Sequence, residues 1–153
     1  MQPKYVVPNI FTSLSFLLAV WSPLVVAGVT GVERPVFYAA SFILFCVLLD
    51  KLDGFAARLF NASSEFGAQY DSLADLIAFG VAPAFLLYSW GLSNIEIKGL
   101  GWAISLIYSI CMALRLARFN TLLNLKSLSS AQHFFFGIPA PCAAGLALVP
   151  IMI

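Results

Sequence analysis

Charged residues are scarce in this chain, since Asp, Glu, Lys and Arg make up only 10% of its 153 residues. An average soluble domain has about 25%. Hydrophobic residues reach 61%, and a soluble core of this size could not bury so much apolar surface. Lipid must therefore be the solvent for much of the chain. The net charge of +1 leaves no basic patch to neutralise many phosphates, which excludes a nucleic-acid-binding protein.

Residues for nucleophilic catalysis or for a zinc site are also scarce. The three cysteines, Cys46, Cys111 and Cys142, stand singly in apolar runs without metal-ligand spacing, so we interpret them as packing residues. The single histidine, His133, precedes three phenylalanines and is interpreted as an interfacial residue without a catalytic role. No Cys, Ser or His has an evident paired base, which argues against a covalent mechanism.

Five apolar runs predict an all-α, polytopic transmembrane helix bundle. Each run is near the ~20 residues that cross a bilayer. The runs cover residues 10–28, 36–60, 72–90, 100–117 and 137–153. The uncharged part of the second run, residues 36–49, would be a helix of about 21 Å, too short for a ~30 Å hydrocarbon core. That helix should therefore continue through residues 50–58, followed by a turn at 61–64 and a third helix beginning near Glu65.

The basic residues predict the orientation in the membrane. With a cytoplasmic N-terminus, only Arg34 and Lys98 of the 8 basic residues lie outside. The inside set is Lys4, Lys51, Arg58, Arg115, Arg118 and Lys126. We therefore expect an integral, multi-pass protein of the cell inner membrane or an equivalent membrane. A cleaved signal peptide is the alternative for the first run, but that run is long for a signal-peptide core.

Four of the 7 acidic residues lie in one short stretch: Asp50, Asp53, Asp71 and Asp75. Carboxylates near a bilayer are costly, which marks them as a candidate functional site. On helices, Asp50 and Asp53 share one face, and Asp71 and Asp75 form a second stripe. Two facing stripes would bring four hard oxygen ligands together, a set suited to Mg²⁺, Mn²⁺ or Ca²⁺. By the membrane orientation above, this site faces the cytoplasm; the alternatives are an ion pathway and a structural ion cluster.

Small residues accompany the aspartates. Gly54 and Ala57 share the face of Asp50, and Gly67 begins the second stripe. Their size would leave space for a nucleotide, the alternative being close helix packing. Arg58 is placed to pair with a phosphate, or else to anchor the helix at the interface. Pro83, inside the third run, is expected to kink its helix.

The complete pattern is similar to the signature of the CDP-alcohol phosphotransferases, membrane enzymes of phospholipid synthesis. Every specified position matches: Asp50-x2-Asp53-Gly54-x2-Ala57-Arg58-x8-Gly67-x3-Asp71-x3-Asp75. Asn9 and Thr12 resemble the family's first-helix motif. Residues 79–84, 115–120 and 137–141 resemble the branch that uses serine as acceptor. Residues 1–153 are thus interpreted as a single domain of this family. The family usually has six spans, so five imply a C-terminally truncated chain.

The resemblance implies transfer of the phosphatidyl group from CDP-diacylglycerol to L-serine, giving phosphatidylserine and CMP by direct displacement in a homodimer. Mg²⁺ or Mn²⁺, two ions per site, would be bound by Asp50, Asp53, Asp71 and Asp75, and Asp75 would also be the catalytic base. The implied CDP-lipid-binding residues are Asn9, Thr12, Gly54, Ala57, Arg58, Ser64 and Gly67. Ser64 is equally well placed as a helix N-cap.

The acceptor site is assigned to Arg115, Arg118 and Asn120. Both arginines lie at the cytoplasmic end of the fourth run, three residues apart on one helix face. A guanidinium and the serine carboxylate form a natural bidentate pair. The alternatives are membrane anchoring for the two arginines and a polar helix cap for Asn120.

Other functions remain open on the sequence alone. The same chemistry could use glycerol phosphate or inositol phosphate, each of which needs a dedicated phosphate pocket. From another class, a small cation transporter or channel subunit would use the four aspartates as an ion site. That reading leaves Gly54, Ala57, Arg58 and Gly67 unexplained. A purely structural subunit would tolerate loss of the aspartates.

Overall fold

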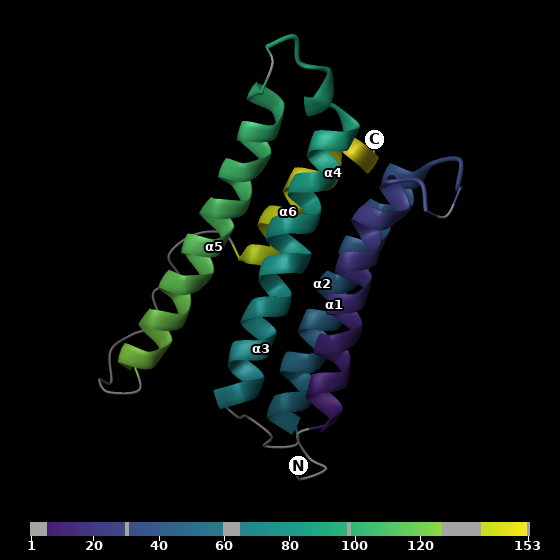
Figure 1. Cartoon of the computed structure of the whole chain (residues 1–153). Coiled ribbons are helices and arrows are strands. Elements are labelled where there is room, and N and C mark those ends of the chain that lie inside the picture. Colours follow the sequence, from purple (N-terminus) through teal and green to yellow (C-terminus); the bar gives the residue numbers. More distant parts are fainter. Residues whose placement is uncertain (1–5, 30, 60–64, 98, 127–138, 153) are drawn as a thin grey trace.

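The computed structural model describes residues 6–29, 31–59, 65–97, 99–126 and 139–152, and every regular element in these ranges is helical. The predicted all-α bundle is therefore confirmed (Figure 1). In chain order the elements are α1 (Val6–Val26), α2 (Pro35–Leu59), α3 (Glu65–Asp75), η2 (Leu76–Val81), α4 (Ala82–Trp90), η3 (Leu92–Asn94), α5 (Leu100–Lys126) and α6 (Ala140–Met152). The predicted turn at 61–64 lies outside the described residues.

Four stretches are long and apolar enough to cross a membrane, which makes this a multi-pass membrane protein. They are Asn9–Val26, Pro35–Phe55, Phe66–Trp90 and Leu100–Thr121. α2 continues through both of its aspartates to Leu59, as the shortness of its uncharged part predicted. Large apolar side chains remain exposed on α5, Ile107 at 59% and Leu114 at 66%, as expected for a surface covered by lipid.

Two helices differ from the predicted runs. α5 does not stop near residue 117 but extends to Lys126. The added segment contains no glycine or proline, so nothing in it ends the helix when the apolar run ends. The described part of the fifth run, α6, has 13 residues, about 20 Å of helix. That length is below the ~20 residues that cross a bilayer.

The third span is built from three consecutive helical segments, α3, η2 and α4. η2 is π-helical, and the backbone N–H of Ala82 donates to the carbonyl of Ile77, five residues earlier. Pro83 follows at the beginning of α4, where it is buried. Where a kink was expected at Pro83, the structure has a π-helical segment directly before the proline, a kind of irregularity common at functional sites.

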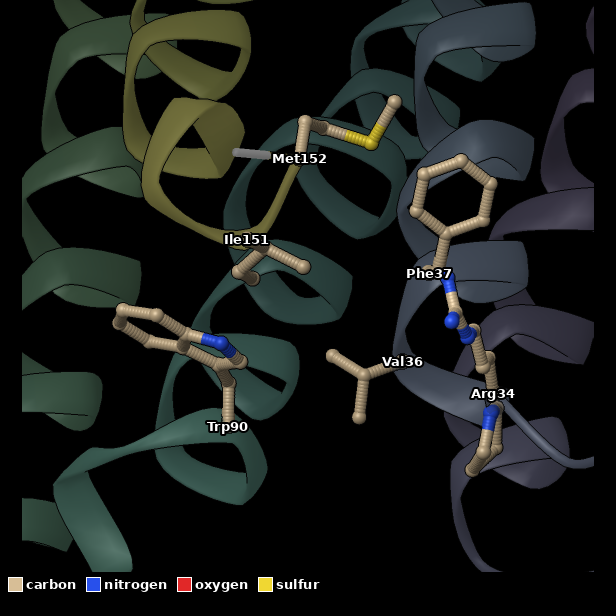
Figure 2. A pocket seen from close by; sticks show the side chains of 7 residues that line it. Arg34, Val36, Phe37, Trp90, Ile151 and Met152 are labelled. Atoms are coloured by element: carbon tan, nitrogen blue, oxygen red, sulfur yellow. The ribbon is translucent and has the colours of Figure 1, made fainter.

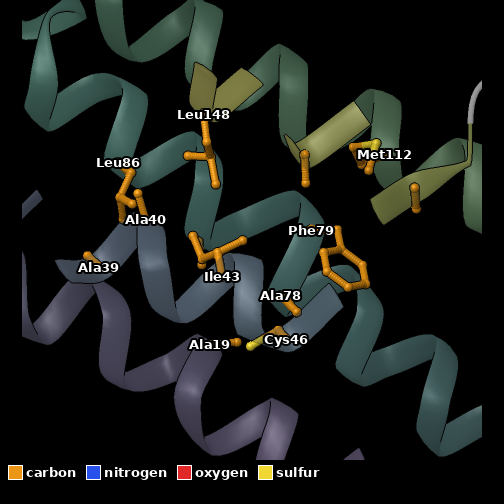
Figure 3. Close-up of a cluster of buried hydrophobic side chains, with 13 residues drawn as sticks. Ala19, Ala39, Ala40, Ile43, Cys46, Ala78, Phe79, Leu86, Met112 and Leu148 are labelled. Atoms are coloured by element: carbon orange, nitrogen blue, oxygen red, sulfur yellow. The ribbon is translucent and has the colours of Figure 1, made fainter. Parts of the chain in front are cut away.

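Small side chains allow the helices to approach one another closely. The buried core consists of Ala19, Ala39, Ala40, Ile43, Cys46, Ala78, Phe79, Ala82, Leu86, Met112, Ala140, Ala144 and Leu148 (Figure 3). Alanine and serine are typical of helix interfaces in membranes, where packing replaces the hydrophobic effect between helices. Ser22 on α1 donates to the Ala39 carbonyl of α2 at 3.1 Å. Of the three cysteines interpreted above as packing residues, Cys46 is fully buried in this core, whereas Cys111 and Cys142 are exposed.

The two ends of the bundle differ in chemistry. The beginning of α1, the end of α2, the beginning of α3 and the end of α5 lie at one end (Figure 1). At the other end, a cavity of about 310 Å³ is lined by Arg34, Pro35, Val36, Phe37, Trp90, Ile151 and Met152 (Figure 2). No carboxylate lines this cavity within the described part of the chain. It is therefore remote from the aspartates, although it is larger than the cavity that adjoins them.

Candidate metal centre and adjoining cavity

Three of the four aspartates converge between α2 and α3, both of which pack against α1. Asp50 and Asp53 come from the last turns of α2, and Asp71 comes from the middle of α3. One carboxylate oxygen from each lies within 4.8 Å of the others. Asp53 is buried, at 5% exposure, whereas Asp50 and Asp71 are half-buried. The facing helical stripes therefore place three acidic groups at one point.

These three side chains suit a hard divalent cation. Two oxygen ligands on opposite sides of such an ion stand about 4–5 Å apart, twice the metal–oxygen distance. The separations among Asp50, Asp53 and Asp71 lie within that limit. Three carboxylates close together repel one another unless a cation lies between them. The donor set therefore suits a hard divalent cation rather than a softer metal.

A hydrogen bond from α1 orients one of these ligands. The Thr12 hydroxyl donates to Asp53 Oδ2 at 3.1 Å, and both side chains are buried. One residue later, the Ser13 hydroxyl lies 3.0 Å from the Tyr70 hydroxyl of α3. Thr12 was assigned to lipid binding from the resemblance, whereas its observed contact is with a candidate metal ligand. α1 therefore supports the cluster from outside its ligand set.

Replacing Thr12 by Val should lower the affinity for Mn²⁺ about 10- to 100-fold, the usual effect of removing a hydrogen bond to a ligand. Titration followed by electron paramagnetic resonance measures this directly. Thr12→Ser keeps the hydroxyl and should bind like the wild type. Ser41→Ala, which removes a hydroxyl bonded only within α2 to Phe37, is the matched control. Unchanged affinity in Thr12→Val would contradict the role given to Thr12.

Asp75 lies beside the three-aspartate cluster and not within it. It is the last residue of α3, directly before η2. Its carboxyl group lies beside that of Asp50, close enough for the two to share a proton. The group of three mutually close ligand atoms does not include it among the described residues. Asp75 thus adjoins the cluster at Asp50, and it also borders a second space.

That space is a cavity of about 170 Å³ between α3, α5 and α6. Its lining residues are Asp75, Arg115, Leu116, Phe119, Pro139, Ala140 and Pro141. Residues from two segments singled out in the sequence, 115–120 and the described part of 137–141, therefore line the same cavity as Asp75, although some 20 residues separate the segments along the chain. A carboxylate and a guanidinium lining one small cavity can accept a proton and bind an anion, respectively.

The remaining acceptor candidates are arranged differently from Arg115. Arg118 is exposed and is not among the described lining residues of this cavity. Asn120 donates from its amide nitrogen to Ser72 Oγ at 2.9 Å. Because α5 continues to Lys126, Asn120 lies inside the helix and is not the helix cap proposed as its alternative role. Its contact joins α5 to α3 one residue after Asp71.

The structure describes some of the proposed lipid-binding residues and not others. Gly54 follows Asp53 on α2, and a Cβ added there would meet no described atom within 4 Å. Open space at Gly54 favours room for a ligand over helix packing. Asn9 and Gly67 are half-buried on α1 and α3. Ala57 and Arg58 lie in the last turn of α2, for which only the backbone is described, and Ser64 lies outside the described residues.

Several residues of this region were not identified from the sequence. Tyr70 and Ser72 contact α1 and α5 through their hydroxyls, and Phe119 lines the cavity. The sequence signal for Tyr70 and Ser72 was that these two hydroxyl residues directly flank Asp71. Hydroxyl and aromatic residues are, however, ordinary in apolar helices, and only the packing of three helices shows which of them face the site.

Sequence comparison shows that the chain is similar to known proteins over most of its length. A family model described as CDP-alcohol phosphatidyltransferase matches residues 5–153. A CDP-diacylglycerol–serine O-phosphatidyltransferase of Helicobacter pylori is 38% identical over 161 aligned residues, covering 100% of this chain and 60% of that protein. Proteins of the same name from Mycobacterium tuberculosis and Methanocaldococcus jannaschii are 41% and 39% identical over 77% and 76% of this chain. The chain spans 42% and 51% of their lengths.

Proposed function

Because the chain belongs to the CDP-alcohol phosphatidyltransferase family, we propose that it transfers the phosphatidyl group of CDP-diacylglycerol to L-serine, releasing phosphatidylserine and CMP. Relatives that carry this activity in their names support the choice of reaction. The observation that carries the proposal is the cavity in which Asp75 and Arg115 lie together, next to three convergent carboxylates.

The donor site is the three-aspartate cluster. Asp50, Asp53 and Asp71 would hold one or two Mg²⁺ or Mn²⁺ ions. When bound, such ions neutralise the pyrophosphate of the CDP-lipid and stabilise the departing CMP. Thr12 orients Asp53, and the space at Gly54 admits the nucleotide. Arg58 is assigned to a phosphate and Asn9, Ala57, Ser64 and Gly67 to the remainder of the lipid nucleotide, on the family pattern.

Asp75 is the proposed general base. As the serine hydroxyl oxygen attacks the phosphorus of the phosphatidyl group, its proton passes to the Asp75 carboxylate. The new oxygen–phosphorus bond forms while the phosphorus–oxygen bond to CMP breaks, and CMP leaves with the electron pair. Asp75 lines the cavity and also contacts Asp50. This placement next to both acceptor and donor supports direct displacement without a covalent intermediate.

Arg115 is the proposed partner of the serine carboxylate. It is the single cation among the described lining residues of the cavity, and the other lining side chains apart from Asp75 are apolar. One guanidinium matches one carboxylate. Glycerol phosphate or inositol phosphate would bring a doubly charged group and greater bulk into a space of about 170 Å³. The lining thus favours serine over phosphorylated acceptors. Asn120 joins α5 to α3 through Ser72, and Arg118 lies outside the described lining.

Arg115→Gln should raise the serine KM about tenfold or more, because a charge-assisted hydrogen bond contributes about 1.5–3 kcal/mol and 1.4 kcal/mol is tenfold. The KM for CDP-diacylglycerol should change much less. Arg118→Gln should have a smaller effect on serine than Arg115→Gln. Arg34→Gln, at the other end of the bundle, is the matched control. Equal loss toward both substrates in Arg115→Gln would indicate a phosphate-binding or folding role.

Serine-dependent CMP release is the deciding assay. Purified protein would be given CDP-diacylglycerol, Mg²⁺ or Mn²⁺, and serine, glycerol phosphate or inositol phosphate in turn. Release with serine alone is the expected result. Release with another alcohol instead would show that the protein catalyses the same reaction with a different acceptor. Cation flux without CMP release would indicate a transporter. We also propose that the site faces the cytoplasm and that the protein is a homodimer. Residues 1–153 would belong to a single transmembrane domain.

A further inference from the structure

The segment 79–84, which the proposed reaction does not use directly, has an unusual backbone. η2 covers Leu76–Val81 and is followed at once by α4, with Pro83 near its start. Pro83 has no N–H, so one carbonyl of the preceding turn loses its backbone donor: that of Phe79 in α-helical spacing, or that of Ala78 in the π-helical spacing of η2. Inside a membrane such a carbonyl needs another donor, because neither water nor lipid supplies one.

Two hydroxyls of α5 donate to backbone carbonyls of η2 in this turn. The Tyr108 hydroxyl donates to the Phe79 carbonyl at 3.1 Å. The Ser109 hydroxyl lies 3.3 Å from the Gly80 carbonyl, as well as from the Ser105 carbonyl of its own helix. A Cβ added to Gly80 would come within 3.4 Å of Met112 Cβ. α5 therefore rests against η2 and is fastened to it by side chain to backbone hydrogen bonds.

The hydrogen bond between Tyr108 and Phe79 lies about one to two helical turns from the two polar residues of the acceptor cavity. Asp75 directly precedes η2, so any rotation of η2 turns its side chain. Arg115 lies on α5, seven residues beyond Tyr108, about two helical turns. The hydrogen bond between Tyr108 and Phe79 thus fixes the helix that carries the proposed base relative to the helix that carries the proposed carboxylate partner.

We propose that Tyr108 is a positioning residue: by donating to the Phe79 carbonyl, it holds the π-helical segment in the orientation that directs Asp75 toward the acceptor hydroxyl. This inference rests on the proposed function for the identity of the acceptor. The hydrogen bond itself does not depend on that identity. Ser109 strengthens the same contact through the neighbouring carbonyl.

The first test is Tyr108→Phe, which removes the hydroxyl and keeps the ring. The kcat should fall about tenfold, because a slightly misdirected base slows proton transfer. The KM for CDP-diacylglycerol should stay unchanged, since the three-aspartate cluster lies on the other side of Asp75. Tyr88→Phe, a half-buried tyrosine of α4, is the matched control. In an Asp75→Asn background, Tyr108→Phe should cause no further loss, because Tyr108 acts through Asp75.

A second variant tests the reason for the hydrogen bond. Pro83→Ala restores an N–H four residues after Phe79, so Tyr108→Phe/Pro83→Ala should recover part of the lost kcat. Hydrogen–deuterium exchange in residues 76–84 should be faster in Tyr108→Phe and slower again in the double variant. This exchange measurement needs no substrate and reports on the contact alone.

The outcomes separate this proposal from the proposed reaction. Wild-type kcat in Tyr108→Phe, or a parallel rise in the KM for CDP-diacylglycerol with loss of thermal stability, would overturn the positioning role. If the wild type used another alcohol in place of serine, the acceptor assignment would fail. The same kcat comparison with that alcohol would still decide the role of Tyr108. Without any CMP release, unchanged exchange in Tyr108→Phe would reject the fastening itself.

Discussion

Replacing Asp71 by Asn should reduce CMP release from CDP-diacylglycerol by at least about 10³-fold, because a metal's stabilisation of transition-state charge is worth several kcal/mol. Asp71 is the contribution of α3 to the three-aspartate cluster. Asparagine keeps the size of the side chain but loses its charge. Asp50→Asn should have a comparable effect, since Asp50 contacts both the cluster and Asp75. Initial rates at saturating substrates measure the loss.

Controls for this prediction use the protein's other acidic residues and its metal. Glu96→Gln removes an exposed carboxylate outside the helical spans and should leave the rate unchanged. EDTA should abolish activity in the wild type, and added Mg²⁺ or Mn²⁺ should restore it. Both aspartate variants should elute and melt like the wild type, because three crowded carboxylates do not stabilise the fold without a cation. Full activity in purified Asp71→Asn would eliminate the cluster as the donor site.

Asp75→Asn should reduce turnover by about 10²–10⁴-fold while CDP-diacylglycerol still binds, because removing a general base has effects of that size. The amide can still hydrogen-bond to Asp50, so the cluster should remain in place. It cannot accept the proton of the serine hydroxyl. Steady-state kcat together with equilibrium binding of CDP-diacylglycerol distinguishes the two roles assigned to Asp75, metal ligand and base.

The arrangement of Asp75 makes this a sharp test. It lies beside Asp50 but outside the group of three mutually close ligand atoms, and it lines the cavity with Arg115. Binding that weakens as severely as turnover would make Asp75 chiefly a metal ligand, and the base would have to be sought elsewhere. Metal affinity measured by the Mn²⁺ titration used for Thr12 provides the independent control.

Local sequence patterns were sufficient to predict the membrane helices and the helical segments that carry the aspartates. A run of about 20 apolar residues has few alternatives to a spanning helix, because lipid satisfies no backbone hydrogen bond. For the same reason, the shortness of residues 36–49 required α2 to continue past Asp53, and α2 does continue to Leu59. Helical spacing also placed Asp50 beside Asp53 and Asp71 beside Asp75 without any knowledge of packing.

The relation between those stripes depends on how the helices rotate and pack, which spacing along one helix does not encode. Packing brings Asp50, Asp53 and Asp71 together and leaves Asp75 beside Asp50. It also directs Arg115 into the cavity and leaves Arg118 outside the described lining. Thr12 meets Asp53 and Tyr108 meets Phe79 across 41 and 29 residues of sequence. Each contact requires a particular rotation of two helices, and these rotations are selected by the small-residue core and the π-helical segment before Pro83.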